Sequence, residues 1–143
     1  MTTTVERVYE IDATPGAVWQ YIADDAIRAE AISVVERFER DGDEMIWHLG
    51  LPIRALPGTV RVRTRDIERR EPEFVRFVGT SRFMDVEGIH DLTETEKGCR
   101  VENRFVVDGH FPGVERFFKR NIDDEIDRLV ETIAERLRED RTK

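Results

Sequence analysis

The sequence is poor in the residues that build cross-links and metal centres. It has one cysteine, Cys99, and three histidines among its 143 residues. A single cysteine excludes an internal disulfide framework and any zinc site with several cysteines. The histidines are scattered over separate segments without an HExxH spacing, and neither a glycine-rich phosphate loop nor a GxSxG elbow is present. We therefore expect no metal and no cofactor.

Long hydrophobic stretches are also missing. No apolar run approaches the roughly 18 residues that a membrane-spanning helix needs. Residues 1–4 lead directly into a strand pattern rather than into a signal peptide, so we expect a cytoplasmic protein without integral membrane association. No linker, repeat or low-complexity stretch interrupts the chain, which predicts one domain over residues 1–143.

Lysine is nearly absent, and most basic residues are arginine. Acidic residues outnumber basic ones by 31 to 23, which gives a net charge of −8. This charge disfavours nucleic acid as a partner. Arg61, Arg63 and Arg65 alternate with apolar or small residues, which indicates the solvent face of a strand paired with acidic neighbours. Two explanations of the composition stay open, a high-salt cytoplasm and a GC-rich genome.

Apolar periodicity predicts strands first and a long helix last. Seven segments have strand character: Val5–Asp12, Val34–Arg40, Glu44–Leu51, Thr59–Glu68, Phe74–Thr80, Phe83–Thr95 and Cys99–Asp108. Their short connections indicate an antiparallel sheet. Two short helices separate the first two strands, the first with Thr14 as N-cap and Pro15 at its first position. Helical spacing from Val114 to about Glu139 predicts an amphipathic helix, and sheet and helix together form an α+β fold.

Two segments resemble a known superfamily. Residues 9–19 read Tyr-Glu-Ile-Asp-Ala-Thr-Pro-Gly-Ala-Val-Trp, similar to the Ile-Asp-Ala-Pro-x-x-x-Val-Trp opening of START-like (Bet v 1-like, SRPBCC) proteins, with Thr14 inserted before the proline. Phe111–Phe118 is similar to the start of the last helix in polyketide cyclase/dehydratase-like members. The resemblance implies a helix-grip fold, in which a curved sheet wraps the terminal helix around an elongated apolar cavity. It does not identify a ligand, because this scaffold serves carriers, receptors, cyclases and chaperone cofactors.

The strand over residues 83–95 carries the most informative polar residue. Its even positions, from Met84 to Leu92, form the apolar face, so His90 should point into the interior. The hairpin at Lys97-Gly98 places His90 opposite either Asn103 or Phe105. Two interpretations stay open: a polar group that orients a ligand or acts as a catalytic acid or base, and a hydrogen-bonded core histidine. His48, His110 and Cys99 are expected outside the site.

The side chains expected to bind the ligand face the predicted cavity. They are Tyr21, Trp47, Leu49, His90, Asn103, Phe105, Phe117 and Phe118. The apolar segment Leu51–Pro57 contains two prolines, which argue against regular strand pairing. It would cover the cavity mouth, contact a second subunit in a homodimer, or touch lipid. We interpret its residues Leu51, Ile53 and Leu56 as a lid.

Three classes of function are compatible with these features. The first is a carrier or sensor that binds a small hydrophobic or lipid-like molecule. The second is a cyclase/dehydratase-type enzyme, in which His90 with Asn103 or Tyr21 would polarise a carbonyl. The third is a protein-interaction module of the chaperone-activator or quinone-associated kind. The scarcity of inward-pointing ionisable groups favours the carrier or sensor.

Overall fold

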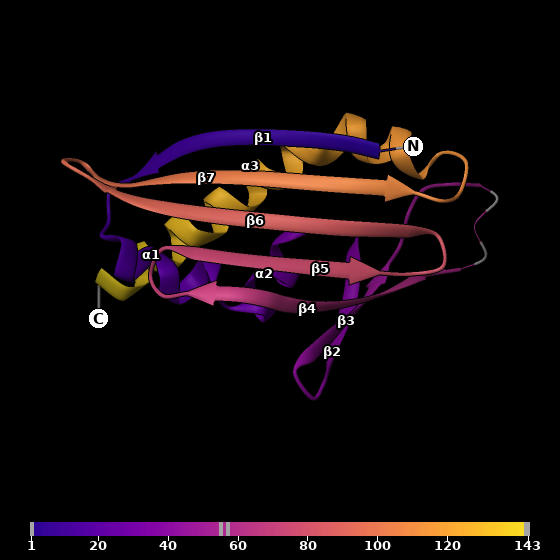
Figure 1. Cartoon of the computed structure of the whole chain (residues 1–143), viewed down its shortest axis with the longest axis horizontal. Helices are drawn as coiled ribbons and strands as arrows, with labels where there is room; N and C mark the ends of the chain where they lie inside the picture. Colours follow the sequence, from indigo (N-terminus) through magenta and orange to yellow (C-terminus); the bar gives the residue numbers. More distant parts are fainter. Residues whose placement is uncertain (1, 55, 57, 142–143) are drawn as a thin grey trace.

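The computed structural model describes residues 2–54, 56 and 58–141 (Figure 1). The elements in chain order are β1 (Thr2–Ile11), α1 (Pro15–Ile22), α2 (Asp25–Ala31), β2 (Val35–Asp41), β3 (Glu44–Leu49), β4 (Val60–Arg70), β5 (Phe74–Thr80), β6 (Met84–Thr95), β7 (Gly98–Gly109) and α3 (Val114–Arg141). The seven strands, the two short helices and the long last helix of the sequence prediction are confirmed. The largest differences are at β1, which begins three residues earlier, and at β3 and β4, whose ends differ by two.

The strands form one antiparallel sheet in the order β1-β7-β6-β5-β4-β3-β2. Strands β2 to β7 each pair with their neighbour in the chain, and β1 adds to β7 at the far edge. Figure 1 shows α3 running across one face of this sheet, with α1 and α2 on the same side. This is the helix-grip arrangement that the sequence predicts.

Local signals in the sequence set the ends of several elements. The Thr14 hydroxyl accepts a hydrogen bond from the Ala17 N–H at 3.2 Å, and the Asp24 carboxylate accepts one from Ala26 at 2.9 Å. These are the N-caps of α1 and α2. The hairpin turn between β6 and β7 requires Gly98, whose φ is +141° and whose Cβ position would lie 2.4 Å from the Ile11 carbonyl oxygen.

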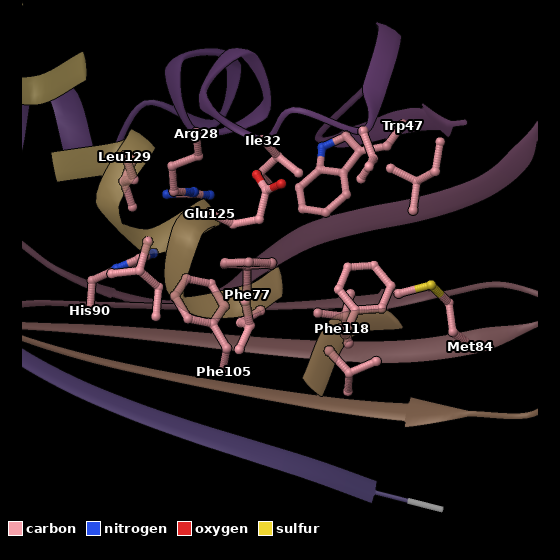
Figure 2. A pocket seen from close by; sticks show the side chains of 16 residues that line it. Arg28, Ile32, Trp47, Phe77, Met84, His90, Phe105, Phe118, Glu125 and Leu129 are labelled. Atoms are coloured by element: carbon pink, nitrogen blue, oxygen red, sulfur yellow. The ribbon is translucent and has the colours of Figure 1, made fainter. Parts of the chain in front are cut away.

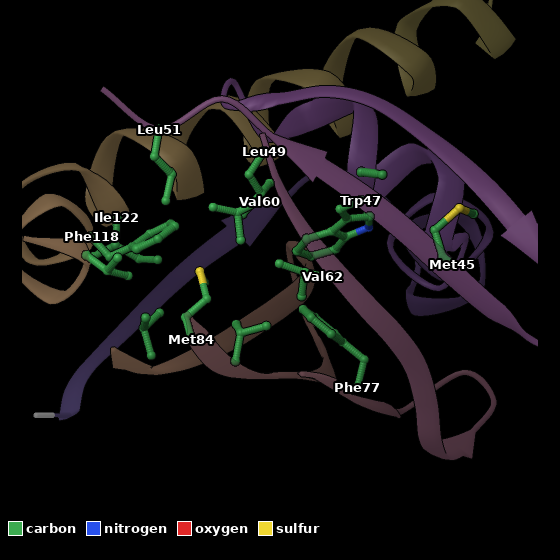
Figure 3. Close-up of a cluster of buried hydrophobic side chains, with 14 of the residues drawn as sticks. Met45, Trp47, Leu49, Leu51, Val60, Val62, Phe77, Met84, Phe118 and Ile122 are labelled. Carbon is green, nitrogen blue, oxygen red and sulfur yellow. The ribbon is translucent and has the colours of Figure 1, made fainter. Parts of the chain in front are cut away.

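The buried side chains form two clusters along α3. The first joins the inner face of the middle strands to the first half of α3 and contains Trp47, Phe77 and Phe118 (Figure 3). The second joins α1 to the second half of α3 and contains Val18 and Ile133. One helix therefore contributes side chains to both clusters.

The outer face of the sheet is polar. Arg61, Arg63 and Arg65 are exposed there, as strand alternation predicts. The Arg63 guanidinium lies 2.8 Å from the Asp41 carboxylate and 3.1 Å from that of Glu44. Along the described part of the chain, no helix combines the length and the hydropathy of a membrane span.

Candidate functional site

A cavity lies between the inner face of the sheet and α3 (Figure 2). Its wall consists of Arg28, Ile32, Val34, Trp47, Leu49, Phe77, Met84, Val86, His90, Phe105, Val107, Phe118, Ile122, Glu125, Ile126 and Leu129. The cavity volume is about 50 Å³. An apolar cavity of about 150 Å³ binds benzene. The cavity is therefore narrower than an aromatic ligand needs in this conformation.

The structure brings together most of the side chains expected at the ligand. Trp47, Leu49, His90, Phe105 and Phe118 line the cavity, and Asn103 lies behind His90.

Two of the expected residues, Tyr21 and Phe117, lie outside the wall. Tyr21, on α1, is partly buried against the second cluster. Phe117 meets Phe118 edge to face, with ring centroids 5.1 Å apart. Neighbouring positions on a helix point about 100° apart, since a turn takes 3.6 residues, so only one of these two rings faces the sheet.

The residues interpreted as a lid pack at one end of the first cluster. Leu51 is buried, and Ile53 and Leu56 are partly buried against that cluster. Ile53 lies against the start of α3, because a Cβ on Gly113 would be 3.4 Å from Ile53 Cγ2. None of the three lines the cavity. Residues 55 and 57 of the same segment lie outside the described residues.

His90 belongs to a buried chain of hydrogen bonds. It pairs with Asn103 in the strand register, which decides between the two alignments left open by the sequence. His90 Nδ1 lies 2.7 Å from Asn103 Oδ1, and the Asn103 amide donates to the Tyr9 hydroxyl at 3.0 Å. An amide oxygen only accepts, so Nδ1 carries the hydrogen and Nε2 keeps a lone pair. Among the described residues Nε2 has no hydrogen-bond partner.

The surroundings of His90 keep its ring neutral. The side chain is fully buried, with Phe77 stacked at 6.2 Å between ring centroids and Phe105 edge-on at 5.5 Å. Burial and, after it, the positive charge of Arg28 lower the pKa of His90 to about 3, and the bond to Asn103 opposes both effects. Burial likewise raises the pKa of Tyr9 to about 12. This chain of groups is therefore uncharged at neutral pH.

Sequence reasoning missed two charged residues of the wall, Arg28 and Glu125. Arg28 is 5% exposed; it donates to the Ile22 carbonyl at 3.0 Å and to Asp66 Oδ1 at 2.5 Å, and its Cζ lies 5.0 Å from the Phe77 ring centroid. Desolvation lowers the pKa of Arg28, and the Asp66 charge opposes that shift.

Glu125 accepts hydrogen bonds from the backbone N–H and the hydroxyl of Ser33. Its inward direction was readable from the sequence, because it stands between Ile122 and Ile126 on the apolar stripe of α3. Arg28 had no such signal. Both charged groups are held by partners within the protein.

The other two histidines lie away from the cavity. His48 is on the opposite face of β3 from Trp47, yet it is buried, and its Nε2 lies 2.9 Å from Glu39 Oε1. His110 is exposed and lies 3.2 Å from Asp85 and 3.5 Å from Asp108. Among the described residues, Asp85, Asp108 and His110 are the group whose donor atoms are close enough to hold a metal ion. This group is at the surface, outside the cavity.

Gly88 shapes the cavity wall from the sheet side. It pairs with Phe77 across β5 and β6, and a Cβ at Gly88 would lie 2.1 Å from Phe77 Cε1. We expect Gly88→Ala to push the Phe77 ring into the cavity and to lower the free energy of unfolding by about 1–3 kcal/mol, the usual cost of overpacking. Urea denaturation measures this loss. Gly16→Ala is the control, since nothing lies within 4 Å of its Cβ position and alanine favours the α1 helix. Equal stabilities of the two variants would contradict the prediction.

Solved structures share this fold at low sequence identity. A conserved protein from Geobacillus kaustophilus superposes with a TM-score of 0.74 and 16% identity, covering 96% of this chain and 94% of that one. A START superfamily protein from Mycobacterium smegmatis gives 0.71 and 10%, over 95% and 97%. The di-domain ARO/CYC StfQ from the steffimycin biosynthetic pathway gives 0.70 and 11%, over 99% of this chain and 52% of that one. The START-like resemblance is thereby confirmed at the level of the fold.

The sequence itself gives a narrower assignment. No curated protein sequence matches the chain significantly. The family model described as polyketide cyclase/dehydrase and lipid transport matches residues 2–134, and the chain belongs to this family.

Proposed function

We propose that the protein binds a small hydrophobic molecule in the cavity between the sheet and α3, as a carrier or sensor. The observation that carries this proposal is the wall itself. Thirteen of its sixteen residues are apolar, and they come from the sheet, from α3 and from the segment between α2 and β2. Ligand sites of small molecules are concave, mostly apolar and supplied with few polar groups. Membership of a family that includes lipid transport supports the same proposal.

Binding requires the cavity to widen. The present cavity volume of about 50 Å³ is about a third of what an apolar cavity offers when it binds benzene. Met84 on the wall is unbranched and adapts its shape at low cost. Ile32 and Val34 belong to the short connection between α2 and β2, which Ser33 ties to Glu125 on α3. We propose that this connection moves when a ligand enters.

The ionisable groups of the wall favour binding over catalysis. A general base works best with a pKa near the operating pH, whereas burial holds the pKa of His90 at about 3. Arg28 is engaged by Asp66 and Ile22, and Glu125 by Ser33. No described group of the wall is left free to move a proton at neutral pH, so we prefer the carrier or sensor to the cyclase-type enzyme.

Two isoleucine substitutions on one strand test the cavity. Val107 and Val101 are both buried on the inner face of β7, but only Val107 lines the cavity, and Val101 packs in the second cluster. We expect Val107→Ile to leave stability nearly unchanged, because its extra methylene enters empty space. We expect Val101→Ile to cost about 1–3 kcal/mol by overpacking. Urea denaturation measures both, and equal costs would mean that the space beside Val107 is not empty.

Ligand binding by the same variants tests the function. Native mass spectrometry of protein purified without detergent, followed by solvent extraction, detects any bound compound, and nuclear magnetic resonance titration with p-xylene detects binding of a defined apolar probe. We expect Val107→Ile to weaken binding of p-xylene and Val101→Ile to retain it. If p-xylene leaves the spectrum of the unmodified protein unchanged and no compound copurifies, the proposed function is wrong.

A further inference from the structure

We propose that the cavity selects neutral hydrophobic molecules that donate a hydrogen bond, such as phenols and alcohols, and that His90 Nε2 accepts this bond. The inference rests on the proposed function of the cavity. Its starting point is an unpartnered acceptor: Nε2 belongs to a fully buried ring of the cavity wall and, like the donor Trp47 Nε1, has no hydrogen-bond partner among the described residues. Buried polar atoms normally have a partner, so an unpartnered one in a cavity wall points to a ligand.

The hydrogen bonds around the ring determine which kind of ligand fits. Nδ1 donates to Asn103 Oδ1, and the Asn103 amide donates onward to Tyr9. The single N–H of the neutral ring is therefore already used, and Nε2 offers only a lone pair. A ligand hydroxyl donates a hydrogen bond to that lone pair. A ketone or ether oxygen has no hydrogen to donate, and its own lone pair would repel that of Nε2. This role differs from that in the alternative enzyme interpretation of the sequence, in which His90 would polarise a carbonyl.

The charges near His90 restrict the ligand to neutral molecules. Figure 2 shows the His90 ring extending from β6 toward the side of the cavity where Arg28 lies. The positive charge of Arg28 acts on His90 and disfavours a second cation there, so ammonium ligands are excluded. A carboxylate has no hydrogen to donate to Nε2, and the Arg28 charge is already balanced by Asp66. Glu125, the remaining charged group of the wall, is bonded to Ser33 on the α3 side.

Three ligands of nearly equal size test the selectivity. p-Cresol donates a hydrogen bond, p-fluorotoluene presents only an acceptor, and p-xylene presents neither. Their affinities are measured by nuclear magnetic resonance titration of the full chain and of His90→Phe. Comparing the cresol-to-xylene affinity ratio between the two proteins removes the different cost of taking each compound out of water. We expect this ratio to fall about tenfold in His90→Phe, the effect of one lost hydrogen bond to a buried acceptor. In the unmodified protein p-fluorotoluene should follow p-xylene.

Two controls separate the outcomes. Phe105→Leu alters the wall beside His90 without a hydrogen-bonding group and should keep the ratio of the unmodified protein. On the unmodified protein, the nitrogen-15 resonance of Nε2 should shift with p-cresol and stay in place with p-xylene, a result that does not depend on a variant folding. The selectivity would be refuted if the two proteins had equal ratios, or if p-cresol left the Nε2 resonance unchanged. Either result would mean that a water molecule is the hydrogen-bond partner of Nε2, and the proposed binding function would still stand. If none of the three compounds binds, the proposed function itself fails.

Discussion

Asp66→Ala is expected to lower the free energy of unfolding by about 3–5 kcal/mol, the cost of leaving one member of a buried ion pair without its partner. The side chains of Arg28 and Asp66 are 5% and 12% exposed, and their closest atoms are 2.5 Å apart. A guanidinium stays protonated under all practical conditions, so it cannot escape this cost by losing its proton. Without Asp66, its positive charge would face Phe77 and the cavity with only the Ile22 carbonyl as a described partner. Urea denaturation at pH 7 measures the loss.

Two further variants show whether burial causes this effect. In the double variant Arg28→Met with Asp66→Ala, no buried charge is left without its partner. Arg69, which also contacts Asp66, is about half exposed and its charge is screened by solvent, so we expect most of the stability to return. Arg63→Ala removes an exposed arginine that also contacts two carboxylates, from Asp41 and Glu44, and should change stability little because solvent screens these pairs. A loss at Asp66 as small as that at Arg63 would show that water reaches Arg28.

The fold could be predicted from the sequence because its signals are local. Strand alternation alone pointed His90 into the interior, and a two-residue turn at Gly98 limited its partner to Asn103 or Phe105. The choice between them depended on the register of β6 and β7, which the structure sets at Asn103. The helix N-caps at Thr14 and Asp24 likewise act within three residues of their own position.

The site was harder to predict because it depends on contacts between distant segments. Arg28 is buried because Asp66, which is 38 residues away, neutralises it. Glu125 bonds to Ser33, which is 92 residues away. In neither pair does the sequence around one residue indicate which distant residue is its partner. The narrowness of the cavity also depends on distant contacts, such as the Phe77 ring that occupies the space over Gly88.

His90 shows how both sequence interpretations can hold for one residue. Its Nδ1 is satisfied by Asn103, as a structural core histidine would be. Its Nε2 belongs to a ring of the cavity wall and has no partner among the described residues, as in a ligand-binding histidine. Periodicity places a side chain on a face of a strand, but it does not distinguish the two edges of an imidazole ring.

Acidification is expected to destabilise the protein through His90, and the sign follows from its environment. The pKa of a histidine in the unfolded chain is 6.5, and burial and Arg28 lower that of folded His90 to about 3. Above pH 6.5 the ring is neutral in both states and contributes nothing to the pH dependence. Between pH 6.5 and about 3, His90 is protonated in the unfolded state but not in the folded state. The free energy of unfolding therefore falls by about 1.4 kcal/mol for each unit by which the pH is lowered.

This contribution can be isolated by comparing the pH dependence of two variants. At pH 5 the loss relative to pH 7 amounts to about 2 kcal/mol from His90 alone. Urea denaturation at both pH values should show this loss in the unmodified protein and in Phe105→Leu, which keeps His90. In His90→Phe the loss of stability between pH 7 and pH 5 should be smaller by about 2 kcal/mol. The comparison uses the change between pH values, so a constant effect of either substitution on stability cancels. If His90→Phe lost as much stability on acidification as the unmodified protein, the folded ring would accept its proton near the ordinary pKa. The apolar wall around it would then be open to water.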